Sequence, residues 1–182
     1  MNWPLSRITI PWKLLLLLPL FHSCSESKPF DAKEAVTQIF APDELQFRKF
    51  EVGMARTDFD AAYTGNAIYG NDLEVIDSMT IGEGVYCETA FRFDKDNLLR
   101  EISVQLVIND ETKKNEIFEA ICQKMKADYG DGIKDRDQFY WRSEGNIVTT
   151  DIYLTDLSSG PRATKENKFV IVLYYTAGTM VS

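Results

Sequence analysis

Residues 85–108, VYCETAFRFDKDNLLREISVQLVI, decide the fold, because they hold two alternating runs on either side of one polar turn. From Val85 to Phe93, every second residue is expected on the buried face of a strand. The DKDN sequence at 94–97 is typical of a hairpin turn. The alternation then returns, with core-facing residues Leu98, Ile102, Val104, Leu106 and Ile108. This stretch therefore predicts an antiparallel meander.

A long amphipathic helix is predicted directly after the meander, at residues 111–129. Asn109 or Asp110 precedes it as an N-cap, and Gly130 follows where a left-handed C-terminal cap belongs. Its apolar stripe comprises Ile117, Phe118, Ile121, Cys122, Met125 and Tyr129. Burying this stripe against the meander would contribute about 1.5–3 kcal/mol per large side chain.

Further elements of both kinds flank this centre. Asp31 and Glu34 have the spacing of a capping box, which predicts a helix that begins at 31 and ends before Pro42. A short strand is expected at 45–52, where Gly53 ends it, then a brief helix at 57–63 and a loop at 64–72. Later strands are expected at 73–81, 139–142, 147–154 and 168–176. The last of these is apolar on both faces, which predicts a central place in the sheet.

The order of these elements predicts the fold class. One helix followed by three strands occurs twice, at 57–108 and at 111–176. We therefore expect an α+β fold, an antiparallel sheet with helices packed on one face, composed of two α-β-β-β halves.

The N-terminal residues have the character of a targeting segment. Arg7 and Lys13 precede an apolar run at 14–21 that is shorter than the roughly 20 residues a membrane-spanning helix needs. The run predicts a signal peptide at 1–23, followed by a polar tether at 24–30 and a single α+β domain at 31–182. Two alternatives remain open: a buried N-terminal helix, or cleavage at another position without a lipid.

The end of that segment, Ser23 followed by Cys24, resembles the signal of bacterial lipoproteins. The resemblance implies that Cys24 is acylated, with palmitate as an expected chain, and anchors the protein to a membrane. It also implies a location in the cell envelope of a Gram-negative bacterium, at the outer membrane and facing the periplasm.

Composition and charge disfavour several classes of function. Cleavage before Cys24 would leave 159 of the 182 residues and lower the net charge from −8 to −10, because Arg7 and Lys13 leave. An acidic chain repels phosphate backbones, so nucleic acid is not an expected partner. The one histidine, His22, leaves with the signal peptide, so a Ser-His-Asp or Cys-His arrangement is not expected.

No cofactor or metal is expected. The sequence lacks a phosphate-binding loop and a dinucleotide-binding fingerprint. The turn at 94–97 fails as a calcium loop, because Leu98 and Leu99 stand where a ligand and a glycine are required. The acidic residues Asp128, Asp131, Asp135 and Asp137 are interpreted as a solvated loop after the long helix.

Cysteines and paired aromatic residues are the remaining candidates for a site. Cys87 and Cys122 are both expected on the core side, either as two buried thiols or as a disulfide. Adjacent aromatic residues on a strand point to opposite sides, so one of each pair must leave the helix-covered face. The two aromatic pairs are Tyr140 with Trp141 and Tyr174 with Tyr175. These four residues form either a partner surface or a patch packed under the polar connection at 155–167.

A second resemblance concerns Gly53 and Met54, the short helix that ends at Tyr63, and the meander after it. Together, these features are similar to the small lipoproteins of the outer-membrane assembly machinery and to β-lactamase-inhibitor-like proteins. This resemblance implies a fold and assigns no role. Our leading hypothesis is a non-enzymatic, lipid-anchored domain that binds or assembles other proteins. An inhibitor or immunity-type protein that captures a basic secreted enzyme is the alternative. A hydrolase that uses two carboxylates is a third hypothesis, which requires a pocket with a raised carboxyl pKa.

Overall fold

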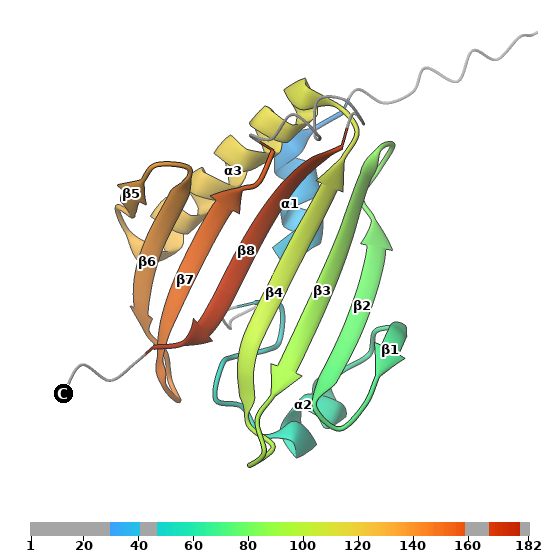
Figure 1. Cartoon of the computed structure of the whole chain (residues 1–182), viewed down its shortest axis with the longest axis vertical. Helices are drawn as coiled ribbons and strands as arrows, with labels where there is room; N and C mark the ends of the chain where they lie inside the picture. Colours follow the sequence, from blue (N-terminus) through green and yellow to red (C-terminus); the bar gives the residue numbers. More distant parts are fainter. Residues whose placement is uncertain (1–29, 41–46, 159–167, 179–182) are drawn as a thin grey trace, which may run out of the picture.

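The computed structural model describes residues 30–40, 47–158 and 168–178, which form a mixed α/β fold dominated by strands (Figure 1). The described helices are α1 (Ala32–Phe40), α2 (Arg56–Ala62) and α3 (Glu111–Tyr129). The described strands are β1 (Ala67–Gly70), β2 (Glu74–Thr80), β3 (Val85–Phe93), β4 (Leu99–Ile108), β5 (Ile133–Asp135), β6 (Gln138–Glu144), β7 (Thr149–Asp156) and β8 (Phe169–Ala177). None of these helices is long and apolar enough to cross a membrane. The predicted signal peptide and Cys24 lie outside the described residues.

The eight described strands form one antiparallel sheet in the order β1-β2-β3-β4-β8-β7-β6-β5. Two meanders of four strands meet where β4 pairs with β8, and Val104 lies opposite Leu173 in this pair. The prediction that the last strand is central is thus confirmed. Even Val172, which points to the other face than Leu173, is only 3% exposed.

The predicted meander and long helix are confirmed. β3 and β4 pair with Thr89 opposite Val104. α3 spans the predicted residues, because the Asp110 carboxylate accepts a hydrogen bond from Lys113 N at 2.8 Å and Gly130 ends the helix with φ 81°. Its buried apolar residues are Ile117, Ile121 and Met125, whereas Phe118, Cys122 and Tyr129 flank them and are half-buried.

The hydrophobic core lies between α3 and one face of the sheet. α3 packs against β4, β6 and β8, and α1 packs against α3, so both helices lie behind the sheet in Figure 1. Their buried residues belong to one cluster with the inward-facing strand residues. α2 contributes Phe59, whose ring centroid lies 5.0 Å from that of Phe91 and 5.1 Å from that of Phe93.

The structure has two edge strands that the sequence did not predict. β1 lies within the expected loop at 64–72, and β5 lies between α3 and β6. All residues of both strands are exposed, so neither strand carries the apolar alternation by which strands are recognised. α2 and α3 are therefore each followed by four strands, and the prediction of three strands per half is wrong.

The strand predicted at 45–52 is wrong in its described part. Residues 47–50 form a tight turn, which is closed by reciprocal backbone hydrogen bonds of 3.1 and 2.9 Å between Phe47 and Phe50. Arg48 has a φ of 52°, in the left-handed region, so the chain reverses here instead of extending. Leu45 lies outside the described residues.

Residues 51–55, which we call the linking segment, connect the two meanders. Gly53 N donates to Leu99 O at 2.7 Å, and Leu99 N donates to Met54 O at 2.8 Å, next to the turn between β3 and β4. The Glu51 carboxylate reaches the turn between β6 and β7, where it accepts hydrogen bonds from Asn146 and Ile147. One short segment thereby contacts both halves of the sheet.

Candidate partner-binding surface

Three tyrosines stand side by side on the face of the sheet opposite α3. The strand register places Tyr140 of β6 opposite Tyr153 of β7, and Tyr153 opposite Tyr174 of β8. The ring centroids of Tyr140 and Tyr153 are 5.2 Å apart. We call these three residues the tyrosine row. It continues across the sheet through smaller side chains, Ser103 on β4 and Ala90 on β3.

The tyrosine row corrects the surface expected from the sequence. Trp141 and Tyr175 are buried, at 3% and 0% exposed, and contribute nothing to a partner surface. Alternation in β6 and β8 turns these two residues toward α3, while Tyr140 and Tyr174 face the other side. Trp141 Nε1 donates to Gly130 O at 3.1 Å, which ties β6 to the end of α3.

Tyr153 completes the row, and the sequence analysis did not single it out. The sequence pattern that could have identified Tyr153 is the alternation within β7, where Ile152 and Leu154 are buried and the residue between them faces away. In a sequence, an isolated tyrosine between two apolar residues does not by itself indicate a partner surface. It gains its significance from the neighbouring strands that the fold places beside it.

A buried carboxylate holds one end of the tyrosine row in place. Asp151 Oδ1 accepts hydrogen bonds from the Tyr140 hydroxyl and from Arg142 Nε, both at 2.7 Å, and Oδ2 accepts from Arg142 Nη2 at 3.2 Å. The hydrogen bond from Arg142 lowers the pKa of Asp151, although burial opposes this shift. Burial and the bond to Asp151 together raise the pKa of Tyr140, so its hydroxyl remains a donor at neutral pH.

We expect Asp151→Asn to lower the free energy of unfolding at pH 7 by about 1 kcal/mol, because a charge-assisted acceptor is lost. A depressed pKa in the folded state means that this stabilisation is present above the unfolded pKa, about 3.9, and disappears as the pH falls through the lower folded value. The difference between the wild type and the variant should therefore shrink as the pH falls below about 4. Urea unfolding across this pH range measures it.

Asp96→Asn is the matched control for this prediction. The Asp96 side chain is exposed in the turn before β4 and no described residue binds its carboxylate, so its effect should be small at every pH. A pH-independent difference for Asp151→Asn would contradict the assigned role of its charge.

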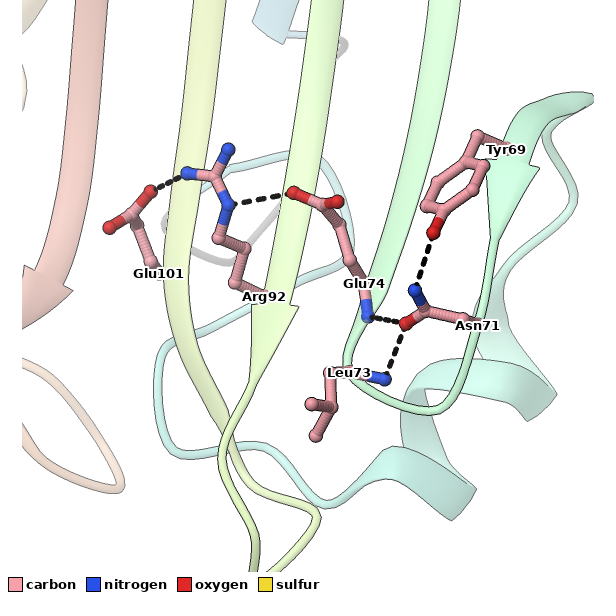
Figure 2. A network of polar contacts seen from close by, with 6 residues as sticks. All are labelled: Tyr69, Asn71, Leu73, Glu74, Arg92 and Glu101. Carbon is pink, nitrogen blue, oxygen red and sulfur yellow. Dashed lines mark hydrogen bonds and ion pairs between the residues drawn. The ribbon is translucent and has the colours of Figure 1, made fainter.

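Charged side chains form a second row beside the tyrosines. The register places Arg142 and Asp151 on one side of the uncharged Thr176, and Glu101, Arg92 and Glu74 on the other, across six strands. Figure 2 shows Arg92 between two acids: its Nε donates to Glu74 at 2.7 Å, and its Nη1 donates to Glu101. These charges are paired with one another, so the surface combines aromatic rings with polar groups that already have partners.

The same network continues into the turn before β2 (Figure 2). Asn71 Oδ1 accepts from Leu73 N and Glu74 N, both at 2.8 Å, and Asn71 Nδ2 donates to the Tyr69 hydroxyl at 2.7 Å. This Asx-type turn orders the edge of the sheet next to the charged row.

Cys87 and Cys122 are free thiols, so the disulfide hypothesis is wrong for this structure. Cys87 lies on β3, whereas Cys122 lines a cavity of about 340 Å³ beside Phe139 and Trp141 of β6. Three strands separate β3 from β6 in the sheet, a distance of roughly 19 Å at about 4.8 Å per strand, whereas a disulfide needs Cα atoms within about 7 Å. Burial raises the pKa of both thiols to about 11, so both keep their protons at neutral pH.

The acidic residues interpreted as a loop lie partly in α3 itself, which includes Asp128, and two of them pair with lysines of that helix. Lys124 pairs with Asp128 at 2.8 Å, and Lys126 pairs with Asp131 at 2.5 Å. Within the described ranges, no group of three or more histidine, cysteine, aspartate or glutamate residues is arranged to hold a metal ion.

Comparison with protein-family models, with curated proteins and with solved structures finds no match to this chain.

Proposed function

We propose that this protein is a lipid-anchored, non-enzymatic domain of the bacterial cell envelope that binds a protein partner through the tyrosine row. The observation that carries the proposal is the alignment of Tyr140, Tyr153 and Tyr174 on three neighbouring strands. Tyrosine is favoured at protein interfaces because its ring supplies contact area and its hydroxyl a hydrogen bond, at little cost in side-chain entropy.

The arrangement of layers supports this role. In our proposal the helices cover one face of an α+β sheet made of two related halves, α2 with β1–β4 and α3 with β5–β8, and the other face receives the partner. The alternation of burial in β4 agrees with a sheet that has only one helix-covered side. The paired charges of Arg142 and Asp151 would lie at the polar rim of the interface, where such pairs are common.

Photo-cross-linking tests the partner surface. A benzoylphenylalanine residue in place of Tyr174 should give a discrete adduct with one envelope protein in intact cells. The same residue in place of Gln123, which is exposed on α3 on the other side of the sheet, should not. Equal labelling from both positions, or none from position 174, would contradict the assignment of this face.

The proposed anchor makes a separate prediction. Cys24→Ala should release the protein from the membrane fraction, because the acyl chains would then have no attachment site. Fractionation of cells that produce the wild type and the variant measures this, and Cys122→Ala serves as a control that should stay with the membrane. Retention of Cys24→Ala in the membrane fraction would exclude the lipoprotein hypothesis.

An inhibitor or immunity-type role is the second proposal. The net charge of −8 favours it, since an acidic surface attracts a basic enzyme and speeds their association. The cross-linked partner distinguishes the two roles: a basic secreted enzyme would support inhibition, and a membrane-associated protein would support assembly. A carboxylate hydrolase has less support, because the described carboxyl groups with shifted pKa values, Asp94, Asp151 and Asp156, have them lowered.

A further inference from the structure

A second potential site lies on the helix side of the sheet, across the sheet from the tyrosine row. It is the cavity of about 340 Å³ that Cys122 lines, between α3 and the strands β5 and β6. We call it the α3–β6 cavity. Pockets for small molecules in proteins measure about 300–1,000 Å³, so a cavity of this size accommodates a molecule of one or two rings.

Three aromatic rings and a thiol form the wall of this cavity. Phe118 and Cys122 are four residues apart on α3 and lie on the same side of the helix, while Phe139 and Trp141 both face α3 from β6. The ring centroid of Phe139 lies 6.1 Å from that of Phe118 and 5.7 Å from that of Trp141. Aromatic pairs prefer offset or edge-to-face contacts at about 4.5–7 Å, so another ring would find favourable partners here.

Trp141 is held in place independently of any ligand. Its Nε1 donates to Gly130 O at 3.1 Å, and a Cβ added at Gly132 would lie only 2.5 Å from Trp141 Cε2. The indole is therefore fixed against the backbone that follows α3. A wall that is already ordered loses little conformational freedom when a ligand binds, which favours the binding of a small molecule.

The exposed charges around the cavity are balanced and paired. Lys126 pairs with Asp131 at 2.5 Å, and Glu119 Oε1 accepts from Gln123 Nε2 at 3.3 Å. Together with Lys134, these lining residues comprise two acids and two lysines, so the lining carries no net charge. A charged ligand would lose its hydration without a matching counter-charge, and the lining therefore favours an uncharged one.

Lys134 and Cys122 favour an aromatic ligand over a saturated one of the same size. Lys134 Nζ lies 5.3 Å from the ring centroid of Phe139, where its ammonium can also approach the face of a ring bound beside it. Burial raises the pKa of Cys122 to about 11, so its thiol is uncharged at neutral pH. Sulfur makes favourable contacts with aromatic rings.

We propose that the α3–β6 cavity binds a small, uncharged aromatic molecule of one or two rings. The ligand packs among the three rings of the wall and against the Cys122 thiol, and the Lys134 ammonium contacts its π-face. This site goes beyond the proposed partner surface, because it lies on the helix-covered side of the sheet.

Titration calorimetry of the full-length protein with 2-naphthol tests the class of ligand. At pH 7, 2-naphthol is planar and uncharged, and it should bind saturably. Decahydro-2-naphthol has the same skeleton without aromatic rings, so it should bind about 10-fold more weakly. The anion 2-naphthoate should also bind more weakly than 2-naphthol. Equal or tighter binding of either analogue, or no saturable heat with 2-naphthol, would overturn the proposal.

Modification by N-ethylmaleimide locates the ligand in the wild-type protein. Saturating 2-naphthol should slow the modification of Cys122, which is half-buried at the cavity, as read by mass spectrometry of the peptide that contains it. Cys87 is 1% exposed and serves as the internal reference, which should stay unmodified with or without the ligand. An unchanged rate at Cys122 would place the ligand elsewhere and overturn the assignment.

Three variants complete the test. Cys122→Phe should fill the cavity and abolish binding, whereas Glu116→Phe, at an exposed position of α3 outside the lining, should leave it unchanged. Phe118→Leu keeps an apolar side chain but removes a ring, so it should fold and bind 2-naphthol about 5-fold more weakly, with no change for decahydro-2-naphthol. Full binding by Cys122→Phe, or an equal loss of both ligands in Phe118→Leu, would contradict the proposal.

Discussion

Replacement of Gly53 by alanine is expected to lower the free energy of unfolding by about 2–4 kcal/mol, through backbone strain and a steric clash. Gly53 has a φ of 95°, a conformation that costs other residues about 1–2 kcal/mol. A Cβ at this position would also lie 2.7 Å from Ile147 Cγ2 and 3.2 Å from Val148 Cγ1. Equilibrium unfolding in urea measures the loss.

Gly82 provides the matched control. Its φ is 76°, and a Cβ built on it would meet no atom within 4 Å. Gly82→Ala should therefore show the conformational cost alone, about 1 kcal/mol. The double variant Gly53→Ala with Ile147→Ala should recover part of the loss, since it removes the closest contact. Equal losses for Gly53→Ala and Gly82→Ala would show that the linking segment does not pack tightly against the turn between β6 and β7.

Glu51→Ala is expected to lower the free energy of unfolding by about 2–3 kcal/mol, because hydrogen bonds to a charged acceptor are lost together. Glu51 is 3% exposed, and its carboxylate accepts from the backbone N–H groups of Asn146 and Ile147 and from the Asn146 side-chain amide. Without the carboxylate, these donors at the turn between β6 and β7 lose their acceptor.

Two further variants define the cause of that loss. Glu51→Gln keeps the shape but replaces one acceptor oxygen by a donor, so it should lose most of the same stability. Glu116→Ala, at an exposed position on α3, should change the free energy of unfolding by less than about 0.5 kcal/mol. A Glu51→Ala variant as stable as the wild type would contradict this account of the linking segment.

These two residues matter because they lie two positions apart in the linking segment and together contact both halves of the sheet. Glu51 and Gly53 contact the turn between β6 and β7, while the Gly53 backbone pairs with Leu99 at the start of β4. The segment thereby connects the two meanders at a second place besides the pairing of β4 with β8. Since the residues are neighbours, the losses of a combined variant should not be additive.

The partner surface could be predicted in part. Adjacent aromatic residues in one strand must point to opposite sides, so the pairs at 140–141 and 174–175 had to place one ring on each face. Which ring is exposed depends on which face α3 covers, and this is a tertiary property. The structure buries Trp141 and Tyr175, and it brings Tyr153 from a third strand between Tyr140 and Tyr174.

By itself, the sequence determined the helices and strands in which apolar side chains recur at a regular spacing. The alternation in β3 and β4, the stripe and caps of α3, and the fully apolar β8 each follow from local patterns, because a strand or helix with a buried face must repeat its apolar residues at its own period. These patterns also sufficed to predict an antiparallel sheet with a central last strand.

Only the tertiary structure decided the features that depend on distant partners. The edge strands β1 and β5 have no buried face, so pairing with β2 and β6 defines them, and periodicity does not. The carboxylate of Glu51 meets Asn146 across 95 residues of sequence, and Cys87 and Cys122 are kept apart by the strand order. A local pattern specifies which residues share a face, but the packing of the whole chain specifies what that face meets.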